Sequence, residues 1–137
     1  STQGVSSAAS DVYKRQIKKL KCSAVLHTHS IYATVLSDYF EKQAAIRLEG
    51  WEMLKGIKGI STHETSIDIP IVSNNQDMKE LCRIVYTHLN SNIPGILVAG
   101  HGLYAWGDSL AAAQRHVEIL EFLFSAVWHK QLLPTVR

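Results

Sequence analysis

The sequence has few of the residues and patterns that mark several large classes of protein. It holds 2 cysteines in 137 residues, too few for a disulfide framework, and Cys22 and Cys82 form no C-x-x-C pair. We therefore expect a reduced, cytoplasmic setting. No apolar run approaches the roughly 18 residues of a membrane span, and the N-terminus lacks the apolar stretch of a secretion signal, so we expect no membrane partner.

A marked excess of charge of one sign is also missing. The formal net charge is +2, and the one dense basic stretch, from Lys14 to Lys21, has no aromatic residue between its charges. Surfaces that bind nucleic acid are usually more basic and carry such aromatics, so we expect no nucleic-acid partner. With 46% hydrophobic residues the chain can form a packed core, and its length fits a single domain.

Two parts of the chain differ in pattern. Residues 1–17 are rich in Ser, Ala and Gln without a clear hydrophobic period, so we expect a disordered or foreign arm there. Residues 18–137 have periodic apolar positions and form the predicted domain. Strand patterns alternate with helix patterns along it, which indicates the α/β or α+β class. The predicted strands are at 22–29, 45–50, 67–72, 95–100 and 103–107, and the predicted helices at 31–40, 51–57, 74–90 and from 108 or 109 towards the C-terminus.

Three local features refine these predictions. Pro70 has no backbone N–H, so we expect its strand to lie near an edge or a bulge. Ser30 can cap the helix at 31–40, and Asn74 or Asn75 can cap the helix at 74–90. In the long C-terminal helix, the apolar side chains expected to pack inward are Leu110, Val117, Leu120, Phe124, Val127 and Leu132.

Two histidines stand two residues apart at the end of the first predicted strand, in the segment LHTHS. Alternate residues of a strand point to the same face, so His27 and His29 project together. Two imidazoles placed in this way can bind one metal ion at bond lengths of about 2.0–2.1 Å. Such a pair can also decorate an exposed strand end, so this segment alone leaves both interpretations open.

A third candidate ligand is His101, because a catalytic zinc site usually takes three protein ligands and leaves one position open. His101 lies between Gly100 and Gly102 after an apolar strand, where the backbone can turn sharply and a large group can approach. The alternative is a turn residue that hydrogen-bonds the backbone. His63 falls in a predicted loop. The histidines with expected surface or helix-packing roles are His88, His116 and His129.

A metal centre of this kind needs a proton-transfer group nearby. Glu52 opens a short apolar helix next to Trp51, and apolar surroundings would raise its pKa into the range useful for acid–base catalysis. The alternative is an exposed glutamate at a helix N-terminus, which the helix dipole favours. Residue chemistry alone does not separate the two interpretations.

Several segments together resemble the class II aldolase/adducin family. They extend over about residues 18–133 and read AVLHTHSIYATVLS, LEGWEMLKGI, STHE, IPIVSNNQDM and GHGLYAWGDSLAAAQRHVEILEFLF. Within the family, the agreement favours the hydro-lyases that dehydrate a methylthio-sugar phosphate in methionine salvage. The resemblance implies an α/β, three-layer fold with a central, mostly antiparallel sheet flanked by helices.

The resemblance also implies a site. Matched motif by motif, it makes His27, His29 and His101 the ligands of one Zn²⁺ per subunit and Glu52 the catalytic acid/base. It implies a small sugar-phosphate substrate and a homotetramer with active sites between subunits. Glu52 therefore need not meet the histidines of its own chain.

Members of this family carry a sizeable N-terminal part that holds the substrate phosphate, and this sequence contains no match to it. We therefore expect the domain at 18–137 to be partial, with a sheet that is incomplete on its N-terminal side, and turnover by this chain to be impaired. Two alternative functions are a class II sugar-phosphate aldolase or epimerase that uses the same three histidines, and a non-catalytic adducin-like binding domain. Product analysis distinguishes the first alternative, and metal content distinguishes the second.

Overall fold

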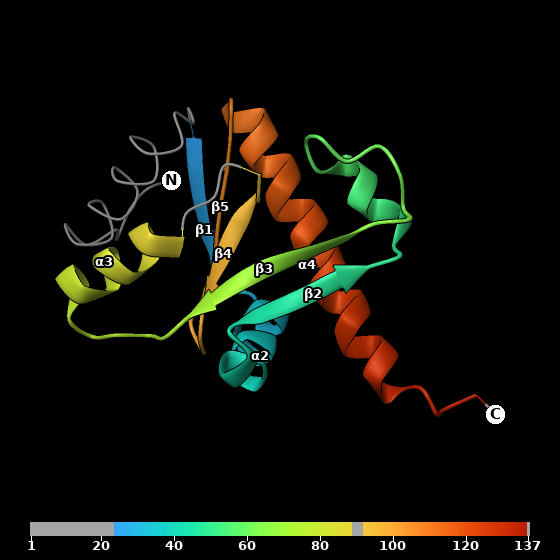
Figure 1. Cartoon of the computed structure of the whole chain (residues 1–137), viewed down its shortest axis with the longest axis horizontal. Helices are drawn as coiled ribbons and strands as arrows, with labels where there is room; N and C mark the ends of the chain where they lie inside the picture. The colour runs from blue at the N-terminus through green and yellow to red at the C-terminus, as the bar shows by residue number, and fades with distance from the viewer. Residues whose placement is uncertain (1–23, 89–91, 137) are drawn as a thin grey trace.

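The computed structural model describes residues 24–88 and 92–136 of the chain (Figure 1). The predicted arm at residues 1–17 lies outside these residues. The strands are β1 (Ala24–Thr28), β2 (Ala45–Glu49), β3 (Ser66–Val72), β4 (Gly95–Val98) and β5 (Gly102–Gly107). The helices are α2 (Ile31–Tyr39), α3 (Met78–His88) and α4 (Leu110–Leu132), with two short 3-10 helices, η1 (Glu41–Gln43) and η2 (Glu52–Gly56). Each corresponds to a predicted element except η1, which the sequence analysis did not anticipate.

The five strands follow the order β1-β5-β4-β3-β2. Among these described strands, β3 and β4 run parallel and the other neighbouring pairs run antiparallel. The sheet is therefore mixed and mostly antiparallel, as expected. β1 and β5 are neighbours although they are far apart in the sequence, and Thr28 at the end of β1 pairs with Leu103 at the start of β5. This pairing brings the end of the first strand and the β4–β5 turn to the same end of the sheet.

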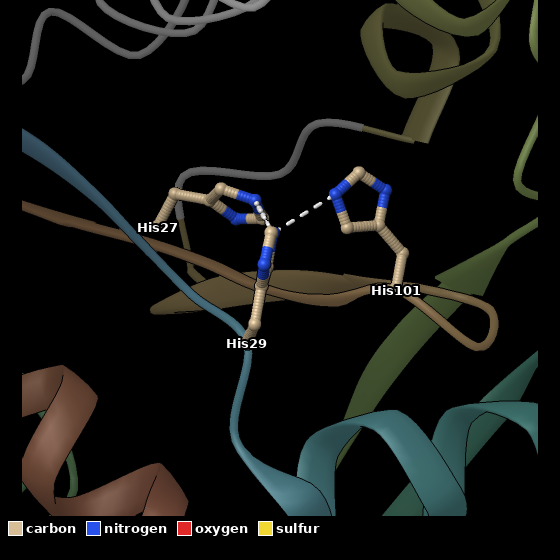
Figure 2. A group of neighbouring side chains, drawn as sticks. All are labelled: His27, His29 and His101. Atoms are coloured by element: carbon tan, nitrogen blue, oxygen red, sulfur yellow. Dashed lines mark hydrogen bonds between the residues drawn. The ribbon is translucent and has the colours of Figure 1, made fainter. Parts of the chain in front are cut away.

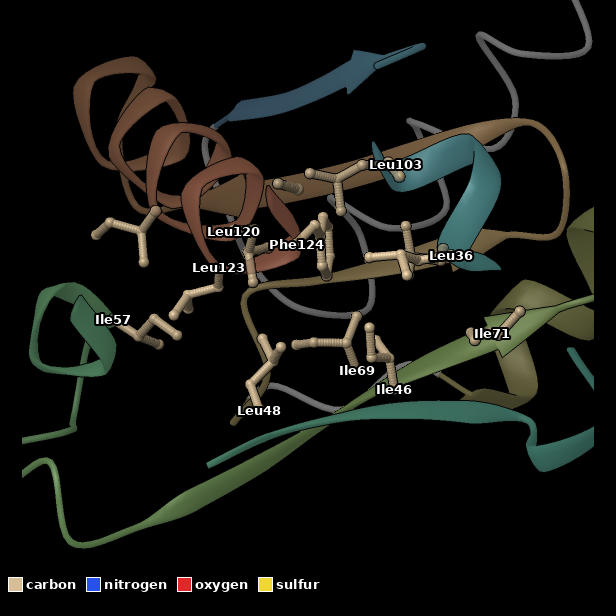
Figure 3. Close-up of a cluster of buried hydrophobic side chains, with 14 of the residues drawn as sticks. Leu36, Ile46, Leu48, Ile57, Ile69, Ile71, Leu103, Leu120, Leu123 and Phe124 are labelled. Carbon is tan, nitrogen blue, oxygen red and sulfur yellow. The ribbon is translucent and has the colours of Figure 1, made fainter. Parts of the chain in front are cut away.

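Helices cover both faces of the sheet. α2 and α4 pack on one face, where the larger buried cluster includes Leu36, Leu120 and Phe124 (Figure 3). Leu103 of β5 faces this cluster and Tyr104 faces the opposite side, which is the alternation expected of a strand. The smaller cluster includes Leu81 of α3 and consists of Val72, Leu81, Ile96, Val98, Tyr104 and Trp106. The helix–sheet–helix layers confirm the predicted α/β architecture.

Pro70 lies in an interior strand of the sheet, although its strand was expected near an edge or a bulge. β3 lies between β2 and β4, but its pairing with β4 begins only at Ile71. The N–H of Ile71 donates to the Ala44 carbonyl oxygen at 2.9 Å, so the nitrogen of Pro70 points away from β2. Pro70 therefore stands one residue before the second neighbour begins, where its missing donor breaks no ladder hydrogen bond.

Serines cap α2 and α4, and the cap of α2 by Ser30 was predicted. Ser30 Oγ accepts a hydrogen bond from the N–H of Ala33 at the start of α2. Ser109 Oγ accepts one from the N–H of Ala112 at the start of α4. Because Ser30 directly follows His29, the first turn of α2 begins next to a candidate ligand.

The predicted cap of α3 was wrong. Asp77, rather than Asn74 or Asn75, accepts the N–H of Lys79 through its side chain at 3.0 Å. Asn75 instead accepts the N–H of Asp77 at 2.8 Å, which forms a turn just before the helix. Asn75, which was expected to cap the helix, therefore shapes the turn before it, and Asn74 lies next to the candidate metal centre.

α4 is longer than the sheet that it covers. Four of the six side chains predicted to face inward are buried or partly buried: Val117, Leu120, Phe124 and Val127. Leu110 and Leu132 are 63% and 65% exposed, so the prediction was wrong at both ends. A helix of 23 residues extends over about 34 Å, and these two leucines lie in its first and last turns. None of the described helices is long and apolar enough to cross a membrane.

Candidate metal centre

β1 and the residue after it position two of the candidate ligands. His27 lies in β1 opposite Tyr104 of β5, and His29 follows the last residue of the strand. Their side chains project to the same side, and their Nε2 atoms are 2.7 Å apart (Figure 2). The alternation that places the two rings together therefore continues one residue past the strand.

His101 reaches the same place from the β4–β5 turn. Gly100 has a left-handed φ of 62°, and the N–H of His101 donates to the Val98 carbonyl oxygen at 3.0 Å, so the chain reverses sharply. The Nε2 atom of His101 lies 3.1 Å from that of His29 (Figure 2). Antiparallel pairing of β1 with β5 makes this meeting possible, since the end of one strand faces the start of the other.

Gly102 permits a close approach between these two strands. A Cβ atom at this position would lie 2.0 Å from the carbonyl oxygen of Thr28, far inside the contact distance of any real side chain. The missing side chain therefore lets the start of β5 pack directly on the backbone that links His27 to His29. The relative position of the turn and the strand end depends on this contact.

The three imidazoles have a spacing that suits metal ligation. Their candidate ligand nitrogens all lie within 4.8 Å of one another. Tetrahedral ligation at about 2.0–2.1 Å separates two ligands by about 3.3 Å, compared with Nε2 separations of 3.1 Å between His29 and His101 and 2.7 Å between His27 and His29. Three imidazole nitrogens suit Zn²⁺ as well as other transition metals. The structure thus brings His27, His29 and His101 together as one candidate centre.

Hydrogen bonds on the outer side of two rings orient them. Nδ1 of His27 lies 2.8 Å from the carbonyl oxygen of Leu103, and because a carbonyl can only accept, this nitrogen carries the proton. Nδ1 of His101 faces Oδ1 of Asn74 at 3.4 Å. In both rings, the Nε2 lone pair is left facing the centre, as in histidine ligands whose outer nitrogen binds a carbonyl or carboxylate.

Burial keeps two of these rings neutral. Burial, with smaller contributions from the charges of His29 and His101, lowers the pKa of His27 from 6.5 to about 4, although the hydrogen bond to Leu103 opposes this shift. Burial, and then the charge of His29, also lowers the pKa of His101. The His27 ring stacks on Tyr104 with 4.0 Å between ring centroids. The neutral imidazole is the form that binds a metal ion.

α2 connects the strand end that carries His29 to the turn that carries His101, a feature that was not predicted from the sequence motifs. Ser37 is fully buried, and its Oγ accepts a hydrogen bond from the N–H of Gly100 at 3.1 Å. Thr34 Oγ1 donates to the carbonyl oxygen of His101 at 3.3 Å. The helix that begins after His29 therefore also holds the turn that carries His101. The available signal was a threonine and a serine three residues apart on an apolar helix, since buried hydroxyl groups need partners.

Glu52 lies away from the histidines of its own chain. It begins η2, whose following loop lies near the end of β5, whereas His101 precedes the start of that strand (Figure 1). Its side chain is 68% exposed, forms an ion pair with Lys55, and has Oε2 3.5 Å from Nδ1 of His63. Of the two interpretations left open, the structure agrees with the exposed glutamate and not with a raised pKa. The hydrogen bond from Lys55 lowers the pKa of Glu52, and the charges of Lys55 and His63 lower it too. The carboxylate faces solvent, so burial does not outweigh these effects.

His116 has the packing role that was expected of it. It is buried, and its Nδ1 donates to the carbonyl oxygen of Trp106 at 2.7 Å. Its Nε2 accepts the backbone N–H of Lys58 at 3.3 Å. Both ring nitrogens are therefore used to tie α4 to β5 and to the loop after η2, and the ring offers no free lone pair to a metal.

Two cavities lie at opposite ends of β5. The larger, of about 570 Å³, borders the loop after η2 and the first turns of α4, with Lys58, Arg115 and His116 among its lining residues. The smaller, of about 460 Å³, opens beside the candidate ligands His29 and His101. Its lining also includes Thr34, Asn74, Asn75, Gln76, Met78, Leu81 and Gly100. Amide groups and an apolar floor next to the histidines suit a small polar molecule.

The fold and the histidine group together define an α/β domain with a candidate transition-metal centre at one end of a mostly antiparallel sheet. The chain belongs to the class II aldolase/adducin family, because the sequence profile of the Class II Aldolase and Adducin N-terminal domain matches residues 9–128. Among solved structures, YgbL from Escherichia coli superposes with a TM-score of 0.72 at 23% identity, over 89% of this chain and 56% of that one. L-fuculose-1-phosphate aldolase from Thermus thermophilus gives a TM-score of 0.68 at 21% identity, over 94% and 63%. These two likenesses concern the fold.

Within this family, the chain is similar in sequence to curated enzymes of one name. The methylthioribulose-1-phosphate dehydratase of Parvibaculum lavamentivorans is 48% identical over 110 residues, which cover 79% of this chain and 54% of that protein. The enzyme of the same name from Picosynechococcus is 48% identical over 102 residues, covering 74% and 48%. The chain thus spans about half the length of the curated relatives that it matches. The similarity confirms the resemblance that the sequence motifs indicated.

Proposed function

We propose that this chain carries the metal centre of a hydro-lyase that converts 5-methylthioribulose 1-phosphate into 2,3-diketo-5-methylthiopentyl 1-phosphate. The main support is the convergence of His27, His29 and His101 in a chain whose relatives at 47–48% identity are named methylthioribulose-1-phosphate dehydratase. A non-catalytic adducin-like domain would have no need of three convergent imidazoles beside an open cavity.

The proposed ligands of one Zn²⁺ are His27, His29 and His101. When bound, the ion supplies Lewis-acid polarisation of the carbonyl and hydroxyl oxygens of the substrate. The hydrogen bonds of Leu103 and Asn74 hold two of the rings with Nε2 towards the centre. The cavity beside His29 and His101 gives a small sugar phosphate access to this side of the group.

Glu52 is the proposed acid/base, acting in the site of a neighbouring subunit of a homotetramer. Its exposure and its distance along β5 from the histidines support a role outside its own chain. Its lowered pKa keeps the carboxylate ionised near neutral pH, which is the form that takes a proton. The carboxylate removes the proton from C3 of the substrate and gives a proton to the C4 hydroxyl, which leaves as water. The resulting enol then ketonises to the diketone.

Metal binding is the first test of this proposal. The purified chain is loaded with Zn²⁺, freed of unbound ion, and analysed for metal by mass spectrometry of the folded protein. One ion per chain is the expected result. A folded chain that retains no zinc at micromolar concentration would overturn the ligand assignment and favour the non-catalytic alternative.

The reaction is tested in a chimaera, because the chain spans about half the length of its relatives. Residues 24–133 replace the matching segment of the Parvibaculum lavamentivorans dehydratase, and the products of 5-methylthioribulose 1-phosphate are identified by mass spectrometry. A single diketone phosphate is expected. Two smaller fragments would indicate aldol cleavage, and a folded, metal-loaded chimaera that releases no diketone would contradict the proposal.

A further inference from the structure

Glu121 of α4 is a carboxylate on a helix that packs against the sheet. It is half-buried and directly follows Leu120, which is fully buried in the larger cluster. Among the described residues it takes part in one hydrogen bond, in which Thr28 Oγ1 donates to Glu121 Oε1 at 2.9 Å. Removing a carboxylate from water costs free energy that an apolar side chain would not cost. The position therefore needs an explanation beyond packing.

Thr28 is the residue between His27 and His29. Because alternate residues of a strand point to opposite faces, its side chain lies on the face opposite to both rings, where it meets α4. Its backbone is equally constrained, since its carbonyl oxygen packs against Gly102 and its strand partner is Leu103. One residue thus joins the strand end that carries two candidate ligands to the helix behind it.

The described pairing of β1 leaves its rotation about its own axis to be set by its side-chain contacts. β1 is the first strand in the sheet order and pairs with β5. A rotation of this strand about its own axis at Thr28 would swing both imidazoles away from His101. A side-chain hydrogen bond to the opposite face resists this rotation, since it acts on the side of the strand away from the rings.

We propose that Glu121 is a positioning residue for the metal centre. By accepting the hydrogen bond of Thr28 it fixes the orientation of His27 and His29, and through them the affinity of the site. The inference rests on the proposed metal site. It assigns Glu121 no contact with metal or substrate, and it requires the hydrogen bond rather than the negative charge.

The test compares variants that keep or remove the hydrogen bond. Thr28→Val and Glu121→Leu remove it, whereas Thr28→Ser and Glu121→Gln keep a donor and an acceptor. Zn²⁺ affinity is measured by competition with a chromophoric chelator. The first pair is expected to bind about 10-fold more weakly, at the lower end of losses caused by changes behind a ligand, and the second pair within about twofold of the native chain.

Two features separate positioning from a general loss of stability. The double variant of Thr28→Val and Glu121→Leu is expected to bind no more weakly than either single variant, because both remove the same hydrogen bond. Glu121→Leu is expected to unfold at a denaturant midpoint no lower than that of the native chain. Four outcomes would each overturn the inference. Thr28→Val and Glu121→Leu could bind zinc with native affinity, or their losses of affinity could add in the double variant. Glu121→Gln could lose as much affinity as Glu121→Leu, or the affinity losses could follow the unfolding midpoints.

A measurement without metal keeps this inference separate from the proposed function. Long-range ¹H–¹⁵N spectra of the metal-free chain report which nitrogen of His27 carries the proton. The native chain and Glu121→Gln are expected to show it on Nδ1, and Thr28→Val and Glu121→Leu to show a mixture of the two tautomers. If the native chain binds no zinc, the proposed function fails while these spectra still decide the inference. Identical spectra in all four proteins would overturn it.

Discussion

The two ends of the sheet are held in different ways. At one end, His27, His29 and His101 are fixed by strand pairing, a glycine contact, buried hydroxyl groups and ring hydrogen bonds. At the other end, the backbone of η2 is anchored by buried Leu54, but the described partners of the Glu52 side chain are the exposed Lys55 and His63. Exposed ion pairs contribute little to stability and leave side chains free to rearrange. The candidate ligands are thus arranged within one chain, whereas the carboxylate is presented to the outside, in agreement with its proposed role in a neighbouring site.

The largest expected effect is at the histidine end. His101→Ala removes one of three candidate ligands, so zinc affinity is expected to fall by more than about 100-fold, beyond the losses caused by changes behind a ligand. Metal content after dialysis measures this directly. His129→Ala is the matched control, since the described hydrogen bonds of this histidine go to Ser125 within α4 and its ring lies against Tyr32. Equal zinc content in His101→Ala and His129→Ala would contradict the assignment of His101 as a ligand.

Glu52→Gln is expected to affect turnover and leave metal binding intact. In the active chimaera, loss of the proton carrier is expected to lower kcat by about 10²–10⁴-fold, while zinc affinity stays within about twofold of the parent. Lys55→Met is the companion variant. It removes the hydrogen bond that lowers the pKa of Glu52, so the acidic limb of the pH–rate profile is expected to move to higher pH. Near-normal turnover by Glu52→Gln would exclude it as the acid/base.

Gly102→Ala tests how far the ligand geometry depends on backbone contact. The added Cβ would lie 2.0 Å from the Thr28 carbonyl oxygen, so the strands must move apart. We expect a loss of about 2–3 kcal/mol in the free energy of unfolding, together with weaker zinc binding. Gly50→Ala is the control, because its φ of 73° carries backbone strain but no atom lies within 4 Å of the new Cβ. Its cost is expected to be about 1 kcal/mol, with zinc affinity unchanged. Native zinc affinity in Gly102→Ala would show that the contact does not set the geometry.

The smallest expected effect is on the pH dependence of the metal-free chain. The folded chain lowers the pKa of His27 from 6.5 to about 4, so between these values the unfolded chain binds more protons than the folded one. Stability is therefore expected to fall as the pH falls from 6.5 to about 4. His27→Gln cannot titrate, and the difference in Tm between the two proteins is expected to change by a few degrees across this interval. A pH-independent difference would contradict the lowered pKa.

The sequence predicted the local parts of the candidate site well. Strand alternation placed His27 beside His29, and the flanking glycines identified the turn that carries His101. What local patterns could not provide is the pairing of β1 with β5, which joins residues 76 apart, such as His27 and Leu103. The family resemblance supplied that relation, because it already associated the three histidines with one another.

The misplaced expectations have local physical causes. One of the two interpretations of Glu52 rested on its apolar neighbours, whereas Lys55, three residues later, lies on the same side and lowers its pKa. Pro70 was assigned to an edge because strand order is not visible in a sequence, and a strand can have one neighbour at one residue and two at the next. The role of Ser37 depends on a turn more than 60 residues away.

The long sequence separation within the histidine group has a consequence for how the chain folds. His29 and His101 are 72 residues apart, so closing the loop between them costs conformational entropy that local helix formation does not. Contacts of this range form late and dominate the barrier in small domains. Binding of a metal ion that needs all three imidazoles would therefore show that β1 has paired with β5. If the three histidines bind zinc as proposed, we expect zinc added during refolding to be captured only after that step and then to slow the separation of the two strands on unfolding.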